Sequence, residues 1–230
     1  MLYFLSIQNN YHQVELALFK DSHILTSLAI SKIDASSQLM LTIKSLLAEH
    51  HLSFKDLSFI AANQGPGPFT TLRVVIATVN GISFATRIPL IGVDGLDVFL
   101  NEYKDTQYPV TVALLNAFNQ DAYFGIDTFG TREKGCKNSE QLLRELHAQH
   151  GNQQIRFIGS GVSTFKEQLT SIFGAQAGSK ILIPIPLPDQ CSVKALGLHA
   201  LENWKTHKNL TYQLLPLYLK SQVIKTTHSL

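Results

Sequence analysis

Cysteine is scarce in this chain of 230 residues. Cys136 and Cys191 lie far apart and without CxxC spacing, so neither a disulfide framework nor a zinc knuckle is indicated. An excess of one charge is also lacking, because 19 Lys and Arg against 17 Asp and Glu give a formal net charge of +2. No basic stripe is present that would bind RNA unaided. We therefore expect two reduced thiols, and a partner for any role on nucleic acid.

Long hydrophobic runs are missing as well. None approaches the ~20 residues that a bilayer span requires. The apolar start at residues 1–7 is short, carries no basic leader and meets polar residues at Gln8, so it predicts a first strand and not a signal peptide. We expect a cytoplasmic protein that does not enter a membrane. The 45% hydrophobic content suffices for a sizeable core, in one large domain or two small ones.

The pattern of apolar residues predicts an α/β protein with two related halves. The first half is read as strands at 1–7, 13–19 and 23–30, a helix at 36–50, a strand at 57–62, a helix at about 70–86, a strand at 89–93 and a helix from 95 toward 103. The second half is read as strands at 109–117 and 121–129, a helix at 139–150, a strand at 155–158, a helix at 162–173, a strand at 181–184 and a helix at 192–204. This order is typical of ribonuclease-H-like subdomains of the actin-like ATPase and sugar-kinase type. We predict two of them, at residues 1–103 and 104–230, the second reduced.

The helix expected at 70–86 has two faces that are apolar or small. One follows the spacing of a core face, whereas Ala77, Gly81 and Ala85 stand at four-residue steps on a different side. A glycine inside a helix costs about 1 kcal/mol relative to alanine, so close backbone approach at Gly81 is indicated. A helix of a partner protein and a neighbouring helix of the same chain, such as 36–50, explain this equally well.

The loop before this helix is predicted to be a rigid structural element, formed by Gly65, Pro66, Gly67 and Pro68. Its two prolines remove N–H donors that a phosphate cradle would need, and no lysine follows the second glycine as in a P-loop. The turn at residues 159–161, Gly-Ser-Gly, is only a weak nucleotide signal, since such a turn is usually a strand-to-helix connection.

No catalytic, cofactor-binding or metal site is predicted. His147 and His150 stand three apart on an expected helix and His50 adjoins His51, but no carboxylate arrangement accompanies either pair. A GxSxG nucleophile elbow is absent. Solvated surface histidines are the expected interpretation.

Several segments together resemble the bacterial TsaB family, also called YeaZ. The central match comprises Gly65 to Arg73, Ile76 to Ala85 and Ile88 to Val93, which resemble the family's GPGSFTGLR, IATAKGLAFA and IPLVGV. Weaker matches are Ala113 to Phe124 and the turn at 159–161, and Pro216 to Lys220 resembles the family's terminal P-x-Y-L-R. The resemblance covers most of the chain, and its central motif is specific.

The resemblance implies a non-catalytic subunit of the machinery that makes threonylcarbamoyladenosine at position 37 of tRNA. It implies an inactive paralogue of the catalytic subunit TsaD that pairs with TsaD through the helices at 36–50 and 70–86. The ATPase TsaE would join them, a homodimer would form in isolation, no cofactor would be needed, and tRNA would be reached only through the complex. The interface residues implied are Leu39, Ile43, Arg73, Val74, Ala77, Thr78, Gly81 and Ala85.

The chain also departs from the family pattern. Gln8 stands where the family has the aspartate of an I-D-T-S segment, and Pro68 and Thr71 replace serine and glycine, which indicates a divergent member. Kinases of this fold use that first-strand carboxylate near Mg²⁺, so its absence argues against phosphoryl transfer. An ATP-handling enzyme of the same fold is the alternative function.

Overall fold

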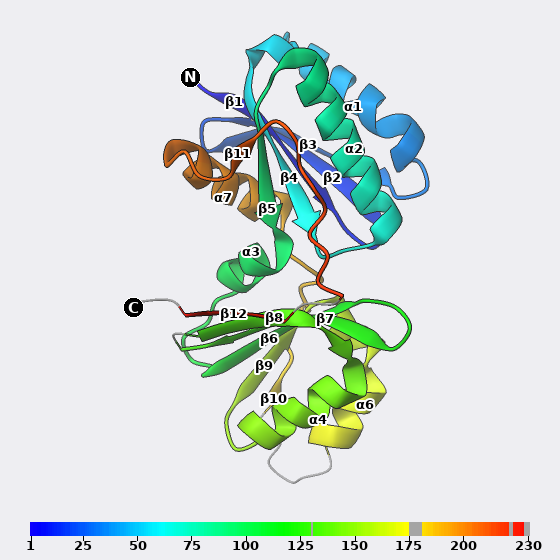
Figure 1. Cartoon of the computed structure of the whole chain (residues 1–230), viewed down its shortest axis with the longest axis vertical. Coiled ribbons are helices and arrows are strands. Elements are labelled where there is room, and N and C mark those ends of the chain that lie inside the picture. Colours follow the sequence, from blue (N-terminus) through cyan, green and yellow to red (C-terminus); the bar gives the residue numbers. More distant parts are fainter. Residues whose placement is uncertain (130, 175–180, 221–222, 228–230) are drawn as a thin grey trace. The chain divides into compact units, whose positions relative to one another are not determined.

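The computed structural model describes residues 1–129, 131–174, 181–220 and 223–227 (Figure 1). The described chain divides into two compact units. The first comprises Met1–Val98 and Ser192–Leu217, and the second comprises Phe99–Cys191 and the segment from Tyr218 onward. This differs from the expected division at residues 103 and 104, because helix α7 (Val193–Lys205) and the segment after it return to the first unit. Burial of the apolar side of α7 on the first sheet accounts for the return.

The first unit is a six-stranded sheet with helices on both faces. Its strands lie in the order β11-β5-β4-β1-β2-β3. They are β1 (Tyr3–Asn9), β2 (Gln13–Lys20), β3 (His23–Ser31), β4 (Leu57–Gly65), β5 (Leu90–Asp94) and β11 (Leu210–Thr211). Strands β1, β2 and β3 form an antiparallel meander, whereas β4 runs parallel to β1 and β5 parallel to β4.

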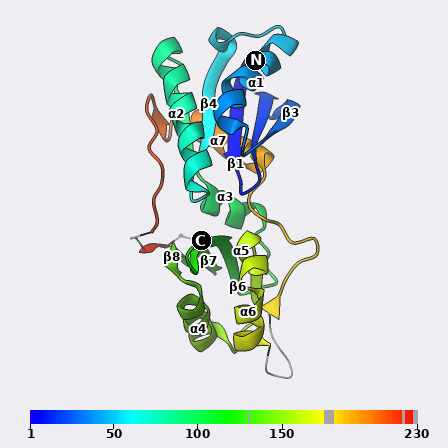
Figure 2. The same ribbon diagram turned by 90° about the vertical axis from the view of Figure 1, so that its right-hand side faces the viewer.

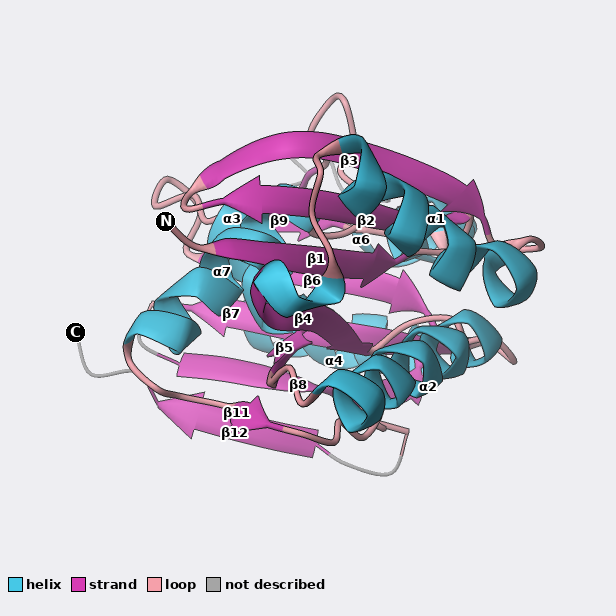
Figure 3. Ribbon diagram, turned by 90° about the horizontal axis from the view of Figure 1, so that it is seen from above, coloured by secondary structure: helices cyan, strands magenta, loops and turns pink. Residues whose placement is uncertain are grey.

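Two helices cover one face of this sheet and one covers the other. Helices α1 (Ala35–Glu49) and α2 (Phe69–Thr86) lie side by side, as Figures 2 and 3 show from two directions. Helix α7 packs on the opposite face, against β1, β2, β4 and β5. A short 3-10 helix (Phe54–Asp56) precedes β4, and α3 (Gly95–Glu102) follows β5.

Alternate residues of β1 build the two cores of the first unit. Leu5 and Ile7 join the buried cluster that includes the inner sides of α1 and α2. Phe4 lies on the other face, where its ring stacks on Phe59, and Phe59 stacks in turn on Trp204 of α7. Because successive side chains of a strand point to opposite faces, one apolar strand supports both layers.

The second unit repeats the strand order of the first. Its sheet runs β10-β9-β6-β7-β8-β12, so β6 to β10 correspond to β1 to β5 in order. The strands are β6 (Val110–Asn116), β7 (Asp121–Thr128), β8 (Thr131–Asn138), β9 (Ile155–Ile158), β10 (Ile181–Leu182) and β12 (Val223–Thr227). Its helices are α4 (Ser139–His150), α5 (Ser160–Thr164) and α6 (Lys166–Phe173). The predicted α/β fold with two ribonuclease-H-like halves, the second reduced, is confirmed.

The structure differs from the expected elements in three places. Strand β8 was not expected because its sequence is polar, but Arg132 on it is buried and pairs with Asp127 at 2.5 Å. The helix expected at 162–173 is two helices, since the backbone leaves helical geometry at Phe165. Strands β11 and β12 add to the sheet edges beyond the predicted strands.

Helix α2 is also long and apolar enough to cross a membrane by length and composition, with a mean hydropathy of 1.3 over its 18 residues. This 18-residue helix corrects the expectation that no apolar run approaches the ~20 residues of a bilayer span. A core helix meets the same criterion, so the finding is weak support for a membrane span. The side of α2 that carries Leu72, Val75 and Val79 lies in the core of the first unit.

Candidate functional site

The loop at residues 65–68 fixes where α2 begins. Gly65 has φ +119°, a conformation that L side chains rarely adopt, and a Cβ there would lie 3.0 Å from the Leu217 carbonyl oxygen. The Leu217 N–H donates to the Gln64 carbonyl at 2.7 Å, and Gln64 Nε2 donates to the Leu215 carbonyl at 2.7 Å. The loop is therefore held against the 215–217 segment. These contacts support a structural role for it.

The same segment is bonded along the side of α2. Asn80 donates from Nδ2 to the Leu214 carbonyl at 3.0 Å and accepts the Leu214 N–H at Oδ1 at 2.8 Å. Ser83 Oγ donates to the Tyr212 carbonyl at 3.2 Å, and the Leu214 side chain is buried. An amide side chain thus pairs with a backbone as a strand would, which holds one edge of the helix in place.

The side of α2 that points away from the core of the first unit is exposed and mostly small or apolar. We call it the α2 face, formed by Arg73, Val74, Ala77, Thr78, Gly81, Phe84 and Ala85. Val74 and Thr78 are half-buried, and the other five residues are exposed. Phe84 is the largest apolar group, with 79% of its surface accessible. An apolar stripe of this kind on a helix is typical of a protein contact.

Close packing within the chain does not explain the glycine. A Cβ built at Gly81 would meet no heavy atom of the described residues within 4 Å. Ala77 and Ala85, at the neighbouring four-residue steps, are exposed too. The explanation that this small-residue side packs on helix 36–50 is therefore wrong for the described part of the chain.

Two residues expected at the interface lie in the core instead. Leu39 is 1% exposed and Ile43 is 0% exposed, and both pack with the sheet residues of the first unit. The family resemblance implied both as contact residues, but the apolar stripe of helix 36–50 covers the sheet of its own chain. On the outer side of α1 the large apolar residue that is exposed is Leu41, at 57%.

Two aromatic residues of α2 were missed by the sequence analysis. The Arg73 guanidinium lies 3.5 Å from the centre of the Phe69 ring, and Phe69 is 51% exposed. Such a cation–π contact orients a guanidinium at the surface. Phe84 could have been found by spacing, since it follows Gly81 by three residues and Ala77 by seven, which places all three on one helical side.

Replacing Gly81 with alanine should stabilise the isolated chain. The methyl group enters open space, and the substitution removes the backbone entropy cost of a glycine inside a helix. We expect a gain of about 0.5–1 kcal/mol in the free energy of unfolding. Urea denaturation followed by circular dichroism measures it. A loss of stability would mean that the exposed side is occupied in the isolated protein.

Of the four histidines expected to be solvated, His51 is exposed, whereas His50, His147 and His150 are half-buried. The His147 ring packs edge-on against Phe173, with centroids 5.2 Å apart, and His50 Nε2 shares a 2.8 Å hydrogen bond with Thr26 Oγ1. The described residues contain no group of three or more His, Cys, Asp and Glu that could hold a metal. Burial, with Asp121 nearby, raises the pKa of the Cys136 thiol, which disfavours a thiolate nucleophile.

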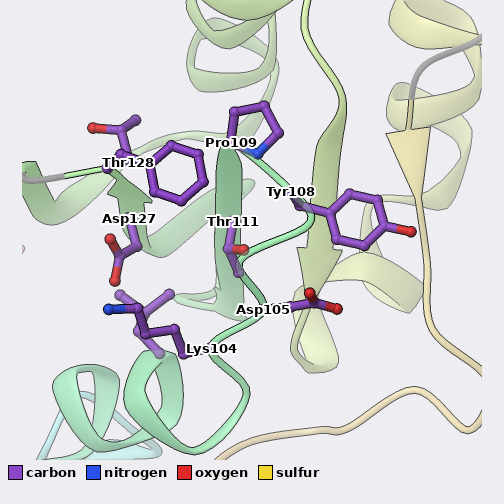
Figure 4. Close-up of a pocket in the computed structure, with 9 residues that line it drawn as sticks. Lys104, Asp105, Tyr108, Pro109, Thr111, Asp127 and Thr128 are labelled. Carbon is purple, nitrogen blue, oxygen red and sulfur yellow. The ribbon is translucent and has the colours of Figure 1, made fainter.

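A small cavity in the second unit has little room for a ligand. Figure 4 shows its wall, which includes Lys104, Thr111 and Asp127. Its volume of about 20 Å³ holds about one water molecule. Asp127 on its wall is already paired with Arg132. The cavity is therefore no candidate for a substrate site.

Comparison with known proteins gives a family match over most of the chain. The profile of the family "TsaD: tRNA N6-adenosine threonylcarbamoyltransferase" matches residues 29–200. The chain is 27% identical over 125 residues to the tRNA threonylcarbamoyladenosine biosynthesis protein TsaB of Buchnera aphidicola from Schizaphis graminum, covering 53% of this chain and 58% of that protein. It is 24% identical over 92 residues to TsaB of Escherichia coli, covering 40% of each. The aligned part thus spans about half the length of these curated relatives.

The solved structure of YeaZ from Pseudomonas aeruginosa has the same fold. It superposes with a TM-score of 0.70 at 21% identity, covering 95% of this chain and 100% of that one. At this identity the likeness concerns the fold alone. Together with the repeated strand order, it shows that the chain has the YeaZ fold, two α/β units with matching strand orders. By the family match, the chain belongs to the TsaD family, in which it is a divergent member of the TsaB (YeaZ) branch.

Proposed function

We propose that this chain is a non-catalytic subunit of the machinery that makes threonylcarbamoyladenosine at position 37 of tRNA. Its α2 face docks on the catalytic subunit TsaD, and TsaE joins the pair. In the absence of TsaD the same face pairs two copies of the chain. The complex acts in the cytoplasm.

The exposed α2 face carries this proposal. A helix that leaves Ala77, Gly81 and Phe84 in solvent exposes apolar area and a glycine that stabilise nothing inside the described chain. Small residues allow a second helix to approach closely, and an exposed phenylalanine supplies the kind of aromatic anchor found at protein interfaces. The relatives named for threonylcarbamoyladenosine biosynthesis supply the pathway.

Loss of catalysis is the second part of the proposal. Gln8, on the first strand, carries no charge and is 1% exposed. A kinase of this fold needs a carboxylate there to hold the metal ion that neutralises the transferring phosphate. An amide cannot supply that charge. The alternative of an ATP-handling enzyme predicts tight binding and turnover of ATP with Mg²⁺ by the isolated chain, which calorimetry and a phosphate-release assay measure.

Reconstitution with TsaD tests the proposed function. The chain and TsaD from the same organism are co-expressed, and we expect them to elute together from a size-exclusion column. We then expect threonylcarbamoyladenosine in tRNA, measured by mass spectrometry of digested nucleosides, only when TsaD, TsaE and this chain are all present. Full modification without this chain would contradict the proposal, as would separate elution of the two proteins.

A further inference from the structure

An open cavity in the first unit lies on the α7 side of the sheet, opposite α1 and α2. Its volume is about 430 Å³, within the range of about 300–1,000 Å³ typical of sites for small molecules. It is lined by the start of the chain, the β2–β3 turn and the end of α7, through Leu2, Asp21, Ser22, Leu201, Trp204, Lys205 and His207. Neither the proposed partner contact nor the core of the unit uses this cavity.

Trp204 is held in place by a row of stacked rings. Phe19, Phe4 and Phe59 stack in succession with centroids 4.6 and 4.4 Å apart, and Phe59 stacks on Trp204 at 5.0 Å. The interplanar angles are only 11°, 16° and 22°. One side of the indole thus rests on a rigid buried base, while the part that remains exposed lines the cavity. A fixed indole is a platform on which a planar ring can stack without ordering the side chain first.

The polar groups around Trp204 differ in charge and in how firmly other residues hold them. Asp21 Oδ1 accepts the Leu2 N–H at 3.0 Å, so the carboxylate is oriented and Oδ2 remains to accept from a ligand amine. Lys205 lies 3.3 Å from Glu202, but both side chains are more than half exposed. An exposed pair of this kind contributes little, so the ammonium can turn to a ligand anion. His207 adds a second nitrogen group to the wall.

We propose that this cavity binds one nucleotide. The base stacks on Trp204, an exocyclic amino group donates to Asp21, and the phosphate lies beside Lys205 and His207. A free nucleotide and an unstacked nucleotide of an RNA strand present the same chemistry. An RNA strand as the source rests on the proposed function, since that pathway acts on tRNA. Binding of such a strand would give this chain a direct contact with tRNA. The site itself depends only on the residues named.

The tryptophan itself reports binding, because Trp204 is the only tryptophan of the chain. Its fluorescence is titrated in the full chain with 5′-AMP, with ribose 5-phosphate and with a single-stranded RNA oligonucleotide. We expect saturable quenching by AMP and by the RNA, and none by ribose 5-phosphate, which lacks a base. Absence of saturable quenching by both AMP and RNA overturns the proposal, and so does equal quenching by ribose 5-phosphate.

The affinities of AMP and of the RNA oligonucleotide, compared with each other, show whether the ligand is a free nucleotide or part of a strand. An RNA that binds about tenfold or more tightly than AMP, with an affinity that falls as salt rises, indicates a strand. Equal affinities indicate a free nucleotide. Both outcomes support the site. The titration contains no TsaD, so its result stands apart from the association test of the proposed function.

Variants of the residues that line the cavity test the assignment, with one variant outside it as the control. Lys205→Gln and His207→Ala change exposed side chains, so the fold should persist while affinity for AMP drops about two- to tenfold. Trp204→Leu should weaken binding of a labelled oligonucleotide ~5-fold or more, measured by anisotropy. Lys44→Gln removes an exposed charge from α1, on the other sheet face, and should change nothing. Unchanged affinity in both Lys205→Gln and His207→Ala overturns the assignment.

Discussion

A Gly81→Leu substitution is expected to abolish association of the chain with TsaD and leave the chain folded. In the isolated chain the new side chain enters open space, since no described heavy atom lies within 4 Å of a Cβ at this position. At a helix contact the same side chain has to be accommodated between two backbones. Overpacking by a few methylene groups costs about 1–3 kcal/mol in a well-packed region, and a misfit helix crossing loses neighbouring contacts as well.

Co-elution with TsaD on a size-exclusion column measures this effect, and thermal unfolding by circular dichroism checks the fold. Ala77→Leu, one helical turn earlier on the α2 face, should give the same loss. Ala48→Leu is the matched control, because it adds a large apolar side chain to an exposed position of α1 outside the α2 face. Normal co-elution of the Gly81→Leu variant with TsaD would contradict the proposed interface. Equal loss in Ala48→Leu would show that any exposed leucine interferes.

A Gly159→Ala substitution is expected to destabilise the second unit strongly. Gly159 has φ +103°, and a Cβ there would lie 2.2 Å from the Leu114 carbonyl oxygen on β6. The backbone cannot withdraw easily, because the Gly159 N–H donates to the Pro188 carbonyl at 2.9 Å and the next N–H donates to Asp189. Strain at such a φ costs about 1–3 kcal/mol and overpacking a similar amount, so the sum is roughly 2–6 kcal/mol.

Urea unfolding followed by far-ultraviolet circular dichroism measures the loss. Ser160→Ala in the same turn is the matched control. Its hydroxyl is buried and has no hydrogen-bond partner among the described residues, so removing it should be neutral or slightly stabilising. Fluorescence of Trp204 reports on the first unit in the same samples. An unfolding midpoint of Gly159→Ala equal to that of the unchanged chain would show that the turn relaxes freely.

The turn at Gly159 illustrates what sequence reasoning can supply. Its two glycines were read as a strand-to-helix connection and only weakly as a nucleotide loop. A Cβ added at Gly161 would lie 2.8 Å from the Leu114 carbonyl carbon. The glycines therefore allow α5 to approach β6. The sequence reveals that small residues are required there, but only the fold reveals what approaches them.

Strand β8 and the position of helix α7 could not be predicted from the sequence. A strand whose residues are mostly polar gives no apolar alternation, and Arg132 became a buried residue only because Asp127 lies across the hairpin to pair with it. Helix α7 was found by its periodicity, but periodicity does not say which sheet a helix will cover. Its return to the first unit depends on contacts more than a hundred residues apart in the chain, such as the 3.1 Å bond from Ser6 Oγ to the Val193 carbonyl.

The sequence by itself determined most of the strands and helices, the family, and the grouping of Ala77, Gly81 and Ala85 on one helical side. Only the tertiary structure decided which apolar faces are covered. Leu39 and Ile43 share one apolar side of α1, as interface residues would, yet that side packs on the sheet of the first unit. The side of α2 around Gly81 is exposed to solvent. The physical reason is that helical spacing fixes which side chains share a face. What packs against that face is set by elements distant in sequence.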